Sequence, residues 1–224
     1  MRTCRAHARA SDPDGLTAID ILVNPDDATV ERAKAVNARL RQCVPSRCTL
    51  DATHLPHVTT LQRYVHTKHL DEVVGAVESV ISATDLSALD YEAAVIRCTD
   101  WNATGQGLAV FFVTINCQVP DFQTAILVAV TPSVDSDGTG AAFVTEADEP
   151  DIEENTLRWV DAVVPDQIGP EYVLHVSLGF ATLAELEVIG AETCDPFPIV
   201  PISIAACHLG NNGNARTELH SRKV

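Results

Sequence analysis

The sequence predicts an α+β fold built from two related halves. The chain has 224 residues and is 46% hydrophobic, which is enough for one large core. Short β-branched runs alternate with stretches whose apolar residues recur at helical spacing. A similar segment occurs once in each half, as "PHVTTLQRY" and as "LHVSLGFAT". We therefore expect a leader over residues 1–16, which lies outside the core, and one duplicated domain over residues 17–224.

The composition excludes several kinds of partner. The net charge is −16 and the pI is near 4.7, so a long DNA or RNA would be repelled unless a basic groove were assembled locally. No run of eighteen apolar residues is present, and we therefore expect no association with a membrane. The leader at 1–16 is basic and alanine-rich but lacks an apolar core of the secretory kind. These features predict a disordered leader and a cytoplasmic protein.

The seven cysteines form an odd set without a C-x-x-C pair, which is typical of reduced packing residues. Cys98, Cys117 and Cys207 fall in apolar, strand-like runs. Cys43 and Cys48 are close enough in sequence to form a bridge in an oxidising compartment, although two unrelated loop thiols are the simpler interpretation.

The first third of the chain predicts the order strand, helix, strand, helix. The run "TAIDILV" (17–23) predicts a strand that Asn24-Pro25 ends. Asp26 or Asp27 then caps a helix, and "HVTTLQRYV" (57–65) predicts the second strand. A second amphipathic helix follows, and its inward face is formed by Leu70, Val73, Val74, Val77, Val80 and Ile81.

The rest of the chain predicts a related order. Residues 92–99 and 108–116 predict a hairpin, because the Asn and Gly residues between them suit a reversal. Residues 120–131 begin with Pro-Asp, which favours a buried helix over a strand. The remaining expected elements are a helix over 152–164, a strand over 171–181, a short helix from Thr182 and a final strand over 197–209.

Between about residues 133 and 151 the chain is strongly acidic, with the runs "DSDG" and "TEADEPD". Like charges at this density favour a solvated loop that is partly mobile. A loop that binds a divalent cation is the alternative, although the segment lacks the alternation and the glycine placement of a calcium loop.

Two histidines carry a hydroxyl residue at the same spacing. In a strand, residues i and i+2 point to one face, so His57 projects with Thr59 and His175 projects with Ser177. The flanking Val58 and Val176 are apolar and point to the other face. Because 118 residues separate the two histidines, they can meet only if the two halves of the chain face each other.

Two strand-borne H-x-[ST] motifs, "HVTT" at 57 and "HVSL" at 175, resemble the 2H phosphoesterase superfamily, which includes 2',5'-RNA ligase-like proteins and cyclic nucleotide phosphodiesterases. The strand ending "ILVNP" and the ending "HLGNNGNARTEL" are also similar to that family, over about residues 17 to 220. The resemblance implies a bilobal, duplicated β-α-β-α-β (LigT-like) fold with two antiparallel sheets facing across a central cleft. It implies His57, Thr59, His175 and Ser177 as the catalytic residues.

The chemistry of these four side chains agrees with the resemblance. Two imidazoles that titrate near neutrality can act as base and acid in an attack on phosphorus, without a metal or other cofactor. The two hydroxyls can donate hydrogen bonds to the phosphate oxygens. The resemblance implies opening of a 2',3'-cyclic phosphate or a related 2',5'-phosphodiester in a small nucleotide or RNA end. The alternative is a non-catalytic nucleotide-binding module with the same fold. The sequence does not assign the acid and the base.

A phosphate pocket also requires a cation or a set of N–H donors, which an acidic chain must supply locally. Arg63, Arg97 and Arg216 are the candidate cations, and Tyr64 and Phe180 are candidates for stacking on a base. For each of these residues a surface charge or a core aromatic is the competing interpretation. We expect the protein to be a monomer.

The stretch "HLPHVTTLQRYVHTKH" (54–69) contains two H-x-x-H pairs, which invite a zinc interpretation. On a strand, residues i and i+3 point to opposite faces, and neither pair has a cysteine or carboxylate at ligand spacing. We therefore expect no metal site, and we expect His54, His66 and His69 to lie outside the active site, as do His208 and His220.

Overall fold

The computed structural model describes residues 15–44, 49–51, 54–100, 105–145, 149–166, 168, 173–192 and 194–224. The predicted leader lies outside these residues except at its end, where Leu16 already begins strand β1 (Leu16–Pro25). Cys4 and Cys48, with Glu146 and Asp148 of the acidic segment, also lie outside them.

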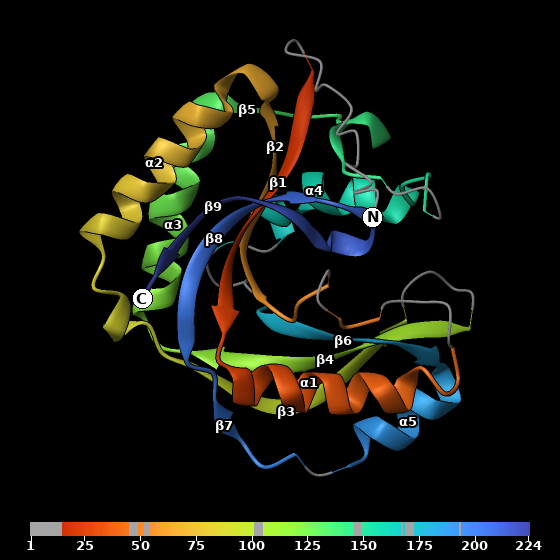
Figure 1. The fold of residues 1–224 in the computed structure, drawn as a ribbon. Coiled ribbons are helices and arrows are strands. Elements are labelled where there is room, and N and C mark those ends of the chain that lie inside the picture. Colours follow the sequence, from red (N-terminus) through yellow and green to blue (C-terminus); the bar gives the residue numbers. More distant parts are fainter. Residues whose placement is uncertain are drawn as a thin grey trace, which may run out of the picture.

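Five antiparallel strands form the first sheet, in the order β5-β2-β1-β8-β9. The four besides β1 are β2 (Val58–His66), β5 (Val134–Asp135), β8 (Pro201–Leu209) and β9 (Ala215–Lys223). The strongly curved first sheet forms the upper part of Figure 1.

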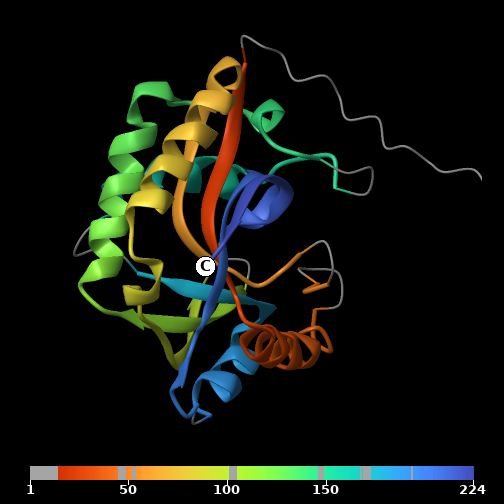
Figure 2. The same ribbon diagram turned by 60° about the vertical axis from the view of Figure 1, so that its left-hand side comes forward.

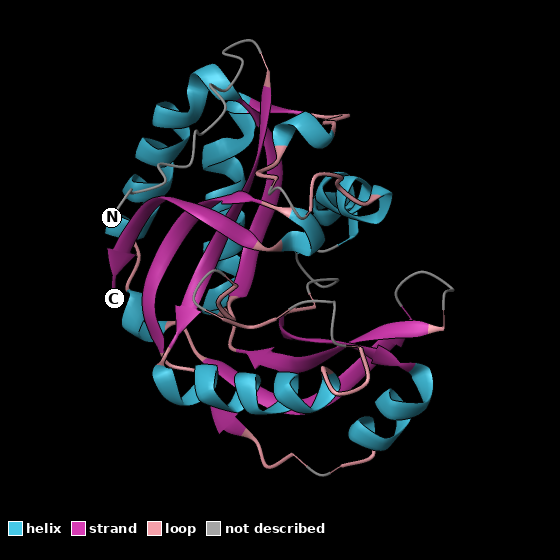
Figure 3. Ribbon diagram, turned by 45° about the vertical axis from the view of Figure 1, so that its right-hand side comes forward, coloured by secondary structure: helices cyan, strands magenta, loops and turns pink. Residues whose placement is uncertain are grey.

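Four antiparallel strands form the second sheet, in the order β6-β4-β3-β7. These are β3 (Tyr91–Asp100), β4 (Gln106–Ile115), β6 (His175–Thr182) and β7 (Phe197–Pro198). Figure 3 shows the two sheets facing each other at an angle, with helices on their outer sides. The predicted α+β class with two antiparallel sheets is confirmed.

Four helices cover the outer faces of the sheets. Helices α2 (Leu70–Ala83) and α3 (Gln118–Val130) pack together against the first sheet. Helices α1 (Asp27–Leu40) and α5 (Leu183–Gly190) pack against the second. Both arrangements are visible in Figures 1 and 2. Helix α4 (Glu154–Asp166) instead packs on the inner face of the first sheet, against β2.

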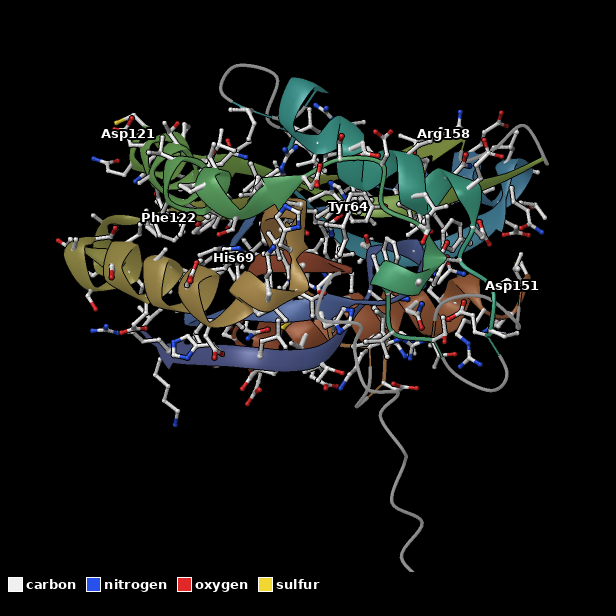
Figure 4. The ribbon with its side chains drawn as sticks, turned by 90° about the horizontal axis from the view of Figure 1, so that it is seen from above. Tyr64, His69, Asp121, Phe122, Asp151 and Arg158 are labelled. Atoms are coloured by element: carbon white, nitrogen blue, oxygen red, sulfur yellow. The ribbon has the colours of Figure 1, made fainter. Side chains whose placement is uncertain are left out.

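Alternation along β1 explains this layering. Ile19, Ile21 and Val23 point outward into the main core beneath α2 and α3, where Phe122 lies between the two helices (Figure 4). Ala18, Asp20 and Leu22 alternate with them, on the inner face. These inner positions of β1 lie on the face of the first sheet that is turned toward the second sheet and α4. A polar residue at such a position can therefore contribute to a site between the sheets.

The two halves of the chain are interlocked. In the order β1-α1-β2-α2, strands β1 and β2 pair in the first sheet, but α1 packs on the second. In the order β4-α3-β5-α4-β6-α5, strands β4 and β6 pair in the second sheet, but α3 packs on the first. The duplicated order of elements is thus present, and each half contributes a helix to the opposite sheet.

The last part of the chain differs from the prediction of one final strand over 197–209. Strand β7 belongs to the second sheet and β8 to the first, so the chain crosses between the sheets at Ile199-Val200. Strand β9 was not predicted, because "ARTELHSRK" is polar and exposed along an edge. The acidic loop also contains a short strand, β5, at the other edge of the first sheet.

Candidate active site

The two H-x-[ST] motifs occupy equivalent places in the two sheets. His57 immediately precedes β2, and His175 is the first residue of β6. In each strand the pairing register slips directly after the hydroxyl residue, so that Thr60 and Leu178 are bulged residues without a direct partner. The bulges bend both strands at the same distance from the histidine.

A buried amide from the opposite half of the chain holds each bulge. Asn37 of α1 donates from Nδ2 to the carbonyl oxygen of Leu178 at 2.7 Å. Gln123 of α3 donates from Nε2 to the carbonyl oxygen of Thr60 at 3.1 Å. Both amides are buried, and they satisfy carbonyls that the slipped ladder does not pair regularly.

Both imidazole rings are oriented in the same way. Nδ1 of His57 lies 2.9 Å from the carbonyl oxygen of Leu55, and Nδ1 of His175 lies 3.2 Å from that of Val173. A carbonyl only accepts hydrogen bonds, so Nδ1 carries a proton in each ring. Nε2 is then the atom of each ring that is available for proton transfer.

The two motifs line one cavity of about 620 Å³ between the sheets. His57, Thr59, His175 and Ser177 all contribute to its wall, together with residues of β3, β4 and α4. The structure therefore brings together the four residues predicted as catalytic. Their roles remain predictions, because geometry alone does not test them.

Two arginines bring positive charge to the cavity. Arg97 of β3 lies with its guanidinium carbon 3.5 Å from the centroid of the Phe112 ring, a cation–π contact. Arg158 of α4, labelled in Figure 4, is exposed and lies near Glu154. Trp159, next to Arg158 on the same helix, also lines the cavity. The sequence predicted only Arg97 of these residues.

Beside His57 lies a buried carboxylate, Asp20 of β1, with no exposed surface. Its Oδ2 accepts hydrogen bonds from Thr59 Oγ1 at 3.0 Å and from Gln62 Nε2 at 2.8 Å. The same oxygen lies 3.5 Å from Nε2 of His57. The hydroxyl proton of Thr59 is therefore directed at Asp20 in this structure.

The two histidines differ in their titration. Burial alone would lower the pKa of His57, but hydrogen bonding to Asp20 and the charge of that carboxylate raise it above the ordinary value. Burial is the main cause that lowers the pKa of His175, and the nearby His57 lowers it further. The surroundings of the pair therefore favour a proton on His57 over a proton on His175.

The structure does not bring three of the predicted binding residues to the cavity. Tyr64 is buried below α4, where its hydroxyl donates to the Leu157 carbonyl (Figure 4). Arg63 is partly buried and faces Asp161 of α4. Phe180 packs below the cavity against its lining residues Leu108 and Val110.

The further candidate Arg216 is also engaged elsewhere, in an ion pair of 2.9 Å with Glu149. Tyr64 and Phe180 are thus buried aromatic residues of strands. Arg63 and Arg216 each lie near a carboxylate.

The other histidines of the described ranges do not line the cavity. His66 Nε2 is 3.4 Å from Asp135, and His69 Nδ1 is 2.5 Å from Glu72. Over the described ranges, no cluster of three or more His, Cys, Asp or Glu side chains is arranged to hold a metal ion. Nor is any helix in that part of the chain long and apolar enough to cross a membrane.

Sequence reasoning missed Asp20, Phe112, Arg158 and Trp159. Asp20 carried the one available signal, because it is an acidic residue at the centre of the apolar run "TAIDILV". A charge in a strand that is buried on both faces requires a partner. The other three lie in segments whose spacing predicts only a strand or an amphipathic helix.

Among the solved structures similar to this chain are two of one protein. One is the structure of Kluyveromyces marxianus Usb1 with uridine monophosphate, at a TM-score of 0.48 and 11% identity, covering 95% of this chain and 100% of that chain. The other is the structure of Kluyveromyces marxianus Usb1, at 0.45 and 11% identity, covering 95% and 99%. At these scores the likeness bears on neither the site nor its chemistry. No family model and no curated protein matches the chain.

Proposed function

We propose that this protein is a metal-independent phosphoesterase that opens a 2',3'-cyclic phosphate or a related 2',5'-phosphodiester in a small nucleotide or RNA end. One observation carries the proposal. Two histidines at equivalent positions of two sheets line one cavity, each with Nδ1 held by a backbone carbonyl and a hydroxyl residue beside it. Two imidazoles supply both the base and the acid that in-line displacement at phosphorus requires.

The surrounding charges favour one assignment of the two roles. His175, whose pKa is lowered, is the base that removes a proton from water or from a ribose hydroxyl. His57, whose pKa is raised by Asp20, is the acid that protonates the leaving oxygen. This assignment places the proton on the ring whose pKa is raised and leaves the other ring as the base.

The phosphate requires donors and positive charge. Ser177 donates to a non-bridging oxygen, and Thr59 does so after its hydroxyl turns from Asp20 toward the bound substrate. Arg97 and Arg158 supply the cations that the overall charge of the chain lacks. Phe112 and Trp159 also line the cavity, where their aromatic rings can stack on the nucleobase of the substrate.

Turnover of a 2',3'-cyclic mononucleotide in the presence of EDTA tests the proposal. We expect hydrolysis by the wild type and a fall of about 100- to 10,000-fold in kcat for His57→Ala and for His175→Ala. His66→Ala is the matched control, since His66 also faces a carboxylate but lies outside the cavity. Loss of activity on addition of EDTA would contradict a metal-independent reaction.

The second candidate is a nucleotide-binding module without turnover. The observation in its favour is that the Thr59 hydroxyl donates to Asp20 and not into the cavity. Calorimetry with the same nucleotide separates the candidates, because a module binds it, does not convert it and retains that binding in His175→Ala.

A further inference from the structure

The two halves of the site differ at one equivalent pair of positions. In the first sheet, Asp20 of β1 is paired with Gln62 of β2, three positions beyond Thr59. In the second sheet, Leu108 of β4 is paired with Phe180 of β6, three positions beyond Ser177. The bulge falls at the same place in both, so the pairs correspond. One motif is backed by a carboxylate and an amide, and the other by two apolar side chains.

Three donor groups converge on Asp20. Thr59, Gln62 and His57 all lie within 3.5 Å of the same oxygen, Oδ2, and the carboxyl group has no exposed surface. A buried carboxylate is costly unless donors or a cation compensate it. Two of its three neighbours belong to the H-x-T motif, so its compensation comes from the site itself.

This arrangement favours one charge state of the His57 ring. Nδ1 faces the Leu55 carbonyl and Nε2 faces the Asp20 carboxylate, and both of these partners only accept hydrogen bonds. An imidazole satisfies both only when both nitrogens carry protons. A neutral ring would direct a lone pair at one of the two acceptors.

No such partner stands at the equivalent position near His175. Its Nδ1 faces the Val173 carbonyl, while the position that corresponds to Asp20 holds Leu108. A neutral ring with its proton on Nδ1 donates to the Val173 carbonyl and needs no second acceptor. Its Nε2 then carries a lone pair that can accept a proton.

We propose that Asp20 is a positioning residue that makes two otherwise equivalent histidines unequal, by holding a proton on His57 and anchoring the Thr59 hydroxyl beside it. Its catalytic consequence rests on the proposed function, in which His57 is the acid. Asp20 lies behind His57 and Thr59 and does not line the cavity, so it acts through them.

Other ionisable groups face this pair. Cys207 of β8 is directly opposite Asp20, and its pKa is raised to about 12, first by burial and then by Asp20 and Glu218, so it stays a thiol. His175 from β6, Arg97 from β3 and Arg158 from α4 line the same cavity as His57. A positive charge on any of the three would oppose a charge on His57, whereas Asp20 and the Leu55 carbonyl favour it.

Asp20→Asn, which keeps the shape and removes the charge, tests the proposal by NMR titration of the imidazole nitrogens. We expect the titration midpoint of His57 to lie above 6.5 in the wild type and to fall by about 1 to 3 pH units in the variant. The midpoint of His175 should change much less. Asp135→Asn is the matched control, because it removes a carboxylate 3.4 Å from Nε2 of a histidine outside the cavity.

The pH profile of kcat/KM gives the second measurement. We expect the alkaline limb to move to lower pH in Asp20→Asn by the same amount as the His57 midpoint, while the acid limb stays. An unchanged His57 midpoint, or an unchanged alkaline limb in an active variant, would overturn the proposal. If Asp20→Asn does not fold, a wild-type His57 midpoint at or below 6.5 overturns it, and one above 6.5 supports it.

The titration does not depend on turnover, so the two proposals fail separately. A protein that hydrolyses no cyclic phosphate but shows the shifted His57 midpoint loses the proposed function and retains the role of Asp20. A protein that hydrolyses a cyclic phosphate but shows an unshifted His57 midpoint retains the proposed function and loses the role of Asp20.

Discussion

Asn37, in the first half of the chain, donates a 2.7 Å hydrogen bond to the backbone carbonyl of Leu178, in the second half. The reciprocal bond, 3.1 Å long, runs from Gln123 of the second half to the carbonyl of Thr60 in the first. Each amide holds the bulge of the H-x-[ST] strand in the opposite half. The two halves therefore shape each other's part of the site.

Asn37→Ala should lower both the stability of the protein and the activity of the site. The Leu178 carbonyl would lose its donor, and an unsatisfied buried polar group costs about 1–3 kcal/mol. The change in the free energy of unfolding can be measured by urea denaturation. Lys34→Ala on the same helix is the control, because Lys34 makes a surface ion pair with Glu31, and the unfolding midpoint of this variant should remain near that of the wild type.

Gly179→Ala should be destabilising, whereas Gly75→Ala should not. Gly179 has a φ of +137°, and a Cβ there would stand 2.7 Å from Nδ2 of Asn37, so the strain should cost about 1–3 kcal/mol. Gly75 lies within α2 with no heavy atom near its Cβ position, and alanine should stabilise that helix by about 0.5–1 kcal/mol. Thermal unfolding of the two variants gives the comparison, and equal shifts would contradict it.

The rate of cyclic phosphate hydrolysis should follow a bell-shaped pH profile. His175 must be neutral, so activity is lost as the pH falls through its lowered pKa. His57 must be protonated, so activity is lost as the pH rises through its raised pKa. Measurement of kcat/KM from about pH 4 to 10 checks this expectation, and a profile that is flat through the histidine range about 6.5 would exclude both roles.

Arg97→Ala should raise KM for a phosphorylated substrate about ten- to a hundredfold, because a hydrogen bond to a charged group is worth about 1.5–3 kcal/mol. Arg97→Lys keeps the charge but loses the planar contact with Phe112, and should recover part of the affinity. Arg32→Ala is the control, since Arg32 lies over the Phe197 ring at 4.4 Å outside the cavity and should leave KM unchanged. Equal effects of the two alanine substitutions would contradict a role in binding.

Local patterns predicted most of the fold. Apolar spacing located α1, α2 and α3, including the Pro-Asp start that favoured a helix over a strand at residues 120–131, where α3 spans Gln118–Val130. Strand β9 and the separation of β7 from β8 were missed. Both depend on which sheet a segment joins, and that choice is made by pairing across the whole chain.

The site divides in the same way. Side-chain alternation in two short strands singled out His57 with Thr59 and His175 with Ser177, and set the neighbouring histidines aside. Alternation could not single out the other residues that line the cavity. Phe112 and Arg158 line it, whereas Tyr64, Phe180 and Arg63 do not, and this difference depends on where the folded chain directs each side chain.

The sequence by itself determined most of the elements, the duplicated order and the two histidine motifs, since these depend on periodicity within about ten residues. The tertiary structure alone decided that the motifs share one cavity and that Asn37 and Gln123 hold opposite strands. It also decided that Asp20 lies beside His57 while Leu108 occupies the equivalent place near His175. A charge state depends on the groups that surround an atom in space, and here those groups come from separate strands of the chain.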